Sequence, residues 1–256
     1  MDAIFLNIDP IFLALAIAVT VFAGFVKGAV GFALPMIMIS GLGSFLTPEV
    51  ALAALILPTV AANVWQALRD GVAAAVASVW RFRVYMVIVM VFIAGSAQLL
   101  RVLPSWALYL ILGVPVTMFA VAQLFGWRLH LKPGHRRRAE VMIAAFAGFV
   151  GGLSGVWGPP TVAYLTAIET PKAEQIRVQG VVYGAGAVML LAAHLNSGVL
   201  NGQTAPLSVA LLVPAMVGMV IGFKVQDRLD QERFRKATLA VLVIAGLNLI
   251  RRGLTG

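Results

Sequence analysis

The chain has 256 residues, of which 61% are apolar and only 11% are charged. Because soluble domains carry about 45–50% apolar and about 25% charged residues, this composition excludes an ordinary soluble globular protein. The net charge is +9, which would suggest a nucleic-acid partner if the protein were soluble. Here the basic residues lie in short loops between apolar segments. We therefore expect no nucleic acid and interpret the charge as a signal of membrane orientation.

The chain begins with an acidic stretch, MDAIFLNIDP, that has no Lys or Arg before the first apolar run. Since a cleavable signal peptide needs a basic n-region, we expect this stretch to be retained. Continuous apolar runs then follow, as is typical of membrane helices and not of β-barrels, whose strands alternate apolar and polar residues. The segments are 11–28, 31–46, 49–69, 80–101 and 105–126, then 140–153, 155–169, 175–196, 206–226 and 233–250. We therefore predict an all-α, polytopic integral membrane protein.

The stretch 11–46 is too long for one crossing. A bilayer core of ~30 Å needs about 20 helical residues, whereas this stretch would extend about 54 Å as one helix. It must break or turn back, and so must 140–169. Glycine and proline mark both breaks, in GFVKGAVGFALP at 24–35 and GFVGGLSGVWGPP at 148–160.

Charge placement predicts the direction of the segments. The linker 127–139 has five Lys or Arg residues, so the positive-inside rule places it in the cytoplasm. The basic linkers near 69–83 and 224–236 should also be cytoplasmic, and the acidic N-terminus should be extracytoplasmic. These assignments agree if each broken pair returns to its starting side; Arg251 and Arg252 then fall outside, against the rule.

The two sets of segments predict an inverted repeat. Each set has five segments, an odd number, so the second set enters the membrane from the opposite side. The motif GFV at 24–26 recurs at 148–150, and Gly28, Gly31 and Pro35 recur at the same offset of 124. We predict an N-terminal transmembrane repeat at 1–126, a basic cytoplasmic linker at 127–139 and a C-terminal transmembrane repeat at 140–256, each repeat opened by a Gly/Pro-broken helix pair.

Matched broken segments in inverted halves point to a transporter binding site. Backbone groups freed by a break are costly in lipid, so a break survives only inside protein or beside a wet cavity. The half-helix that follows offers unpaired N–H donors and a partial positive charge, which suit an anion. The alternative is that the glycines only allow close helix packing, and Gly24 with Gly28 and Gly148 with Gly152 fit that small-xxx-small pattern.

Polar residues within the apolar segments complete the candidate site. Lys27 lies well inside a segment, where a charge is costly and often marks a pathway, although a lysine can also snorkel to an interface. Asn63 and Gln66 share a helix face, as do Gln179 and Tyr183, and either pair could bind an anion or join two helices. The predicted substrate-binding residues are Lys27, Gly28, Gly31, Asn63, Gln66, Gly152, Ser154, Gly155, Trp157, Gln179 and Tyr183, and the predicted broken-helix residues are Gly24, Pro35, Gly148, Gly158, Pro159 and Pro160.

The two glycine-proline motifs, read as GFVKGAVGFALPMIMI and GFVGGLSGVWGPPTVAYL, resemble the TauE/SafE sulfite-exporter family, over essentially the whole chain. The resemblance implies a bacterial inner-membrane permease that exports sulfite, sulfoacetate or related organosulfur anions. That family is often described as having eight spans, whereas the length argument favours two broken pairs and six ordinary spans. The family's signature falls here on Gly24, Gly28, Gly31, Pro35, Gly148, Gly152, Gly155, Gly158 and Pro159.

We therefore expect a multi-pass permease that exports a small inorganic or organosulfur anion, sulfite or a short sulfonate, across the bacterial inner membrane. The anion would bind near the midplane between the two broken-helix motifs. An anion channel and an accessory membrane subunit without transport activity are the alternatives. With no cysteine, no metal-ligand cluster and no paired carboxylates at membrane depth, we expect no enzyme, no metal and no cofactor. The expected partners are the anion and the lipid bilayer, and a homodimer is one option for the oligomeric state.

Overall fold

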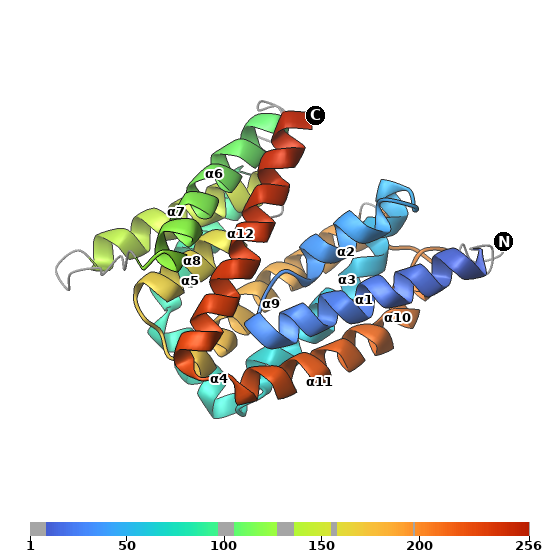
Figure 1. Cartoon of the computed structure of the whole chain (residues 1–256). Coiled ribbons are helices and arrows are strands. Elements are labelled where there is room, and N and C mark those ends of the chain that lie inside the picture. Colours follow the sequence, from blue (N-terminus) through green and yellow to red (C-terminus); the bar gives the residue numbers. More distant parts are fainter. Residues whose placement is uncertain (1–8, 97–104, 127–135, 155–157, 197, 256) are drawn as a thin grey trace. The chain divides into compact units, whose positions relative to one another are not determined.

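The computed structural model describes residues 9–96, 105–126, 136–154, 158–196 and 198–255, and every regular element in these ranges is a helix (Figure 1). Five of the described helices are long and apolar enough to cross a membrane, or six if the bent pair α4–α5 forms one span. The prediction of an all-α, multi-pass membrane protein is confirmed.

The helices pack into two units. Unit 1 comprises Met1–Val72 and Gln179–Leu229, and unit 2 comprises Ala73–Val178 and Asp230–Gly256. Each unit thus contains parts of both predicted repeats. Unit 1 holds α1 (Pro10–Val30), α2 (Leu34–Leu42), α3 (Pro48–Leu68), most of α9 (Lys172–Asn196), α10 (Ala205–Ala210) and α11 (Leu212–Arg228). Unit 2 holds α4 (Val72–Arg81), α5 (Arg83–Ser96), α6 (Ser105–Leu124), α7 (Arg136–Ser154), α8 (Gly158–Ala167), the first turns of α9, and α12 (Gln231–Thr255).

The first predicted break is present, and local sequence explains both of its ends. Helix α1 starts where the Asp9 carboxylate accepts a hydrogen bond from the N–H of Ile11 at 2.7 Å, an N-cap contact. It ends at Gly31, which adopts φ 90° and donates its N–H to the Lys27 carbonyl at 2.6 Å. Glycine takes this left-handed conformation without a Cβ penalty, so it suits the end of a helix. Pro35 in the first turn of α2 then favours a new helix start.

In unit 1, α1 packs closely along α11 (Figure 1). A Cβ atom added at Gly24 would overlap the Ala215 backbone, and one at Gly218 would overlap the Val21 backbone. Glycines on both helices therefore allow their backbones to touch, as in other membrane helix pairs. The buried side chains Leu34, Met38 and Leu42 of α2 belong to the same hydrophobic cluster as Ala23 of α1 and Ala215 of α11.

In unit 2, α5 packs on α7 and α6 packs on α12. A Cβ atom at Gly148 of α7 would lie 2.5 Å from the Val89 carbonyl oxygen of α5. A Cβ atom at Gly113 of α6 would lie 3.0 Å from the Gly246 carbonyl oxygen of α12. Close glycine contacts thus hold the main helix pairs of both units.

One predicted segment boundary was wrong and another was right. The expected linker 69–83 is largely helical, because its run of alanines has high helix propensity and forms α4. Helices α4 and α5 meet at Phe82 with a bend of 74°. The expected segment 206–226 is confirmed as one membrane-length span, Ala205–Arg228, in which α10 and α11 meet at Leu211, close to Pro214, which has no N–H to donate.

Candidate functional site

Lys27 lies in the last turn of α1, and its side chain is almost fully buried, with 1% of the residue exposed. Its Nζ donates to Asn63 Oδ1 of α3 at 2.7 Å and to the Gly31 carbonyl oxygen at 3.5 Å. The ammonium also lies 5.7 Å from the centroid of the Tyr183 ring of α9, a cation–π distance. Within the described residues, every partner of this buried cation is neutral.

The break between α1 and α2 supplies one wall of the site. The Gly31 carbonyl oxygen accepts from Gln66 Nε2 at 3.0 Å as well as from Lys27. The predicted backbone donors for an anion are those of the half-helix after the break; the N–H of Gly31 itself is bonded to the Lys27 carbonyl. In the first turn of α2, Pro35 has no N–H and Ile37 donates its N–H to the Ala33 carbonyl at 3.0 Å, so this turn can offer an anion at most the N–H groups of Leu34 and Met36.

Helix α9 also contributes to the site, through Tyr183. Gly180 lies against the backbone of Gln66 and Ala67, so α9 and α3 approach closely there. Gln179 precedes Tyr183 by one turn, is 0% exposed, and has no hydrogen-bond partner within the described residues for either side-chain polar atom. A buried amide left unpaired costs about 1–3 kcal/mol, so Gln179 destabilises the protein as it stands; its role in binding substrate stays a prediction.

Five of the predicted substrate-binding residues therefore meet in one cluster of unit 1: Lys27, Gly31, Asn63, Gln66 and Tyr183. We call these residues the Lys27 cluster. A cation held by neutral oxygens in a buried place is incompletely compensated, since burial penalises charge unless it is paired. The cluster is suited to receive an anion.

Three glycines of the predicted site have packing contacts. Gly24 and Gly28 of α1 lie against the backbone of α11, and Gly148 of α7 lies against α5. These contacts support the helix-packing alternative for all three residues. The role of Gly28 in binding substrate stays a prediction.

The second predicted break is described only at its edges. Helix α7, with Gly152 and Ser154 in its last turn, ends at Ser154, and α8 begins at Gly158. Pro159 and Pro160 lie buried in the first turn of α8, where proline favours a helix start. Gly155 and Trp157 lie outside the described residues. That the two breaks share one cavity stays a prediction.

Sequence reasoning missed a polar cluster at the end of α3, formed by Arg69, Phe223, Gln226 and Asp227, which we call the Arg69 cluster. Arg69 donates from Nη1 to Gln226 Oε1 at 2.6 Å and from Nη2 to Asp227 Oδ2 at 2.5 Å. Its guanidinium carbon lies 4.1 Å from the centroid of the Phe223 ring. The sequence held one signal, because Arg69 follows Gln66 by three residues and so lies on the same side of α3.

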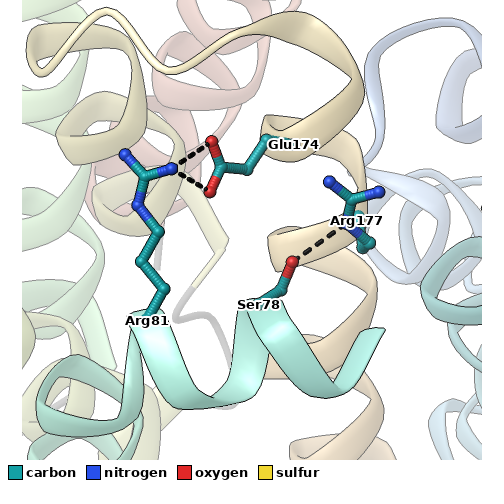
Figure 2. Close-up of polar contacts among 4 residues, drawn as sticks. All are labelled: Ser78, Arg81, Glu174 and Arg177. Atoms are coloured by element: carbon teal, nitrogen blue, oxygen red, sulfur yellow. Dashed lines mark hydrogen bonds and ion pairs between the residues drawn. The ribbon is translucent and has the colours of Figure 1, made fainter. Parts of the chain in front are cut away.

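A second polar cluster ties α4 to the start of α9 in unit 2, as Figure 2 shows. Arg81 Nη1 contacts both carboxylate oxygens of Glu174, at 2.7 and 2.8 Å, and Arg177 Nε donates to Ser78 Oγ at 2.9 Å. In unit 1, Arg69 contacts Asp227. In both units, segments predicted to lie on the same side of the membrane are in contact.

Unit 2 also contains a cavity of about 470 Å³. Its walls carry both signs of charge, from Glu169, Glu232 and Arg235, so it lacks the unbalanced positive charge of the Lys27 cluster. The remaining lining residues are Thr166, Thr170, Pro171, Gln175 and Gln231.

The chain was compared with known families, curated proteins and solved structures. A family model described as "Sulfite exporter TauE/SafE" matches residues 16–249, nearly the whole chain. No significant match was found among curated proteins or among solved structures.

Proposed function

Because the chain belongs to the sulfite exporter TauE/SafE family, we propose that it exports a small sulfur oxyanion, sulfite or a short sulfonate, across the bacterial inner membrane. The anion binds at the Lys27 cluster, where the ammonium supplies the fixed positive charge. The buried lysine with neutral partners is the observation that carries this proposal.

The chemistry of the cluster favours an anion over a cation or an apolar solute. An intramembrane charge of this kind usually marks a substrate or ion pathway. An oxyanion can accept from Lys27 Nζ and from the Gln179 amide, and charge-assisted hydrogen bonds of this type are the strong ones. Binding would complete the charge balance that Asn63 and Gly31 provide only in part.

Export does not require a proton relay in this proposal. An anion leaving a cell that is negative inside gains ~2.3 kcal/mol per charge per 100 mV. The membrane potential therefore suffices as the driving force, and clamping it with potassium and valinomycin should change the rate of transport.

The test is sulfite flux in proteoliposomes, with sulfate, sulfonates, carboxylates and chloride as competitors. Lys27→Met should abolish flux while the protein still inserts and folds. Lys27→Arg should transport poorly, because a planar guanidinium replaces a compact ammonium. Lys236→Met is the matched control, since that lysine is 65% exposed on the side chain and pairs with Glu232 in its own helix. Wild-type flux in Lys27→Met would exclude Lys27 as the anion's partner.

A further inference from the structure

The Lys27 cluster continues along α3 toward Arg69. Thr59, Asn63 and Gln66 are buried polar residues that recur at helical spacing, and Arg69 follows Gln66 one turn later. Six residues separate Asn63 from Arg69, a rise of about 9 Å along the helix. The positive charge of Arg69, at the end of α3, therefore lies within two turns of Asn63, which accepts a hydrogen bond from Lys27.

Two neighbours fix the Arg69 guanidinium in place. Gln226, which is 3% exposed, accepts from Nη1, and the Phe223 ring lies against the guanidinium plane. Trp65 in turn packs edge-on against Phe223 with ring centroids 5.6 Å apart. The orientation of Arg69 thus depends on buried neutral contacts.

The third neighbour, Asp227, is bound differently. Its side chain is 57% exposed, and it contacts Arg69 Nη2 through one carboxylate oxygen. Exposed ion pairs contribute little net stability because water solvates both charges well. A carboxylate is itself an oxyanion, so Asp227 occupies a position that a small oxyanion from solution can take.

We propose that Arg69 is a second anion-binding residue, at the end of the pathway predicted to be cytoplasmic, and that Asp227 is a resident counter-ion which the substrate oxyanion displaces. This inference rests on the proposed function. Arg69 captures the anion from solution while Gln226 and Phe223 hold the guanidinium, and the anion then passes along α3 to Lys27. Asp227 lowers the apparent affinity on that side by competing for the same Nη2 donor.

The test measures the half-saturating sulfite concentration separately from each face of oriented vesicles. Arg69→Gln should raise it roughly tenfold on the face that bears Arg69, as expected for the loss of a charge-assisted hydrogen bond. Arg69→Lys should keep part of the affinity, because the charge remains. Asp227→Asn should lower the half-saturating concentration on that face by up to about fivefold, the range of an exposed ion pair.

The matched control is Asp230→Asn. It removes the same charge from the same linker, but Asp230 pairs with exposed Arg233 and caps α12, a role that asparagine also fills. It should leave the half-saturating concentration unchanged. The double variant Arg69→Gln with Asp227→Asn should match Arg69→Gln alone, since the proposed effect of Asp227 on affinity depends on its contact with Arg69.

The inference is overturned if Asp227→Asn leaves the affinity unchanged or weakens it, or if Asp230→Asn strengthens it equally. A change confined to the maximal rate, with unchanged half-saturation in Arg69→Gln, would also overturn it. If flux needs Lys27 yet ignores Arg69, only this inference fails. If the wild-type protein moves none of the anions, the proposed function fails with it.

Discussion

Lys27 shows how one residue's neighbours decide what it can bind. Its hydrogen bond to Asn63 is short, at 2.7 Å, and the acceptor is a neutral amide oxygen. An aspartate in that place would give the lysine an internal counter-ion and leave an incoming anion no net positive charge to bind. The choice of amide over carboxylate is therefore the feature that keeps the site open to anions.

Asn63→Asp should thus eliminate anion transport without unfolding the protein. The new carboxylate has nearly the shape of the amide and forms an ion pair with Lys27. Sulfite flux measures the first effect, and the melting temperature in detergent measures the second. Asn248→Asp, which also places a carboxylate beside a cation, Arg251, at an exposed position, should change neither. Normal flux in Asn63→Asp would contradict an anion site at Lys27.

Gln179→Leu should stabilise the protein and weaken transport together. The buried amide has no partner for Nε2 or Oε1 within the described residues, so an apolar side chain of similar size removes a desolvation cost of about 1–3 kcal/mol. Thermal unfolding in detergent and sulfite half-saturation are the two measurements. A lower melting temperature would mean that Gln179 has a structural hydrogen-bond role instead.

At the scale of helices, glycine contacts determine which elements pair. The backbone of α1 meets that of α11 at Gly24, Gly28 and Gly218, and no side chain separates them. Substitution there is costly, because the nearest atoms are backbone atoms, which cannot rotate away. The same small residues that the sequence offered as site candidates are thus required for packing.

Gly24→Ala should lower stability by about 1–3 kcal/mol, the usual cost of overpacking. Its Cβ would overlap the Ala215 carbonyl oxygen. Gly95→Ala is the control, because a Cβ there meets nothing within 4 Å in the described part of the chain. Denaturation in detergent should separate the two variants; equal melting temperatures would show that α1 and α11 can shift apart at little cost.

The sequence was sufficient to predict the helical type of the elements and the first break, because apolar length and Gly/Pro placement dictate these locally. It also brought forward Lys27, Asn63, Gln66 and Tyr183 as site candidates. It could not predict the bend at Phe82, since alanine-rich chain suits a linker or a surface helix equally. Nor could it identify the Arg69 cluster, whose partner lies 158 residues away in the chain. Partners that distant depend on tertiary packing.

At the scale of the molecule, helix pairing agrees with the predicted inverted repeat, which stays a prediction. In that repeat α1 corresponds to α7 and α5 to α11. The observed pairs are α1 with α11 and α7 with α5. The first helix of each half therefore packs on the helix that forms the fourth predicted segment of the other half. An exchange of this kind is what a duplicated, inverted chain would produce.

Topology can be tested with single cysteines, since the chain has none of its own. Asn201→Cys should react with an impermeant maleimide added outside intact cells, and Arg233→Cys should react only after the inner membrane is opened. Both residues are exposed. Labelling of both from the same side would contradict the predicted orientation and the inverted repeat together.

The pairing of α1 with α11 also sets an order of events during synthesis. Helix α1 leaves the ribosome early, yet the glycine-lined face that receives it belongs to α11, nearly 200 residues later in the chain. Until α11 emerges, lipid has to cover the face of α1 that carries Gly24 and Gly28, although the partners of Lys27 on α3 and α9 have already been made. Assembly of unit 1 is therefore expected to finish only when translation is nearly complete, and a chain that stops before α11 should be recognised by the cell's membrane proteases as unfinished.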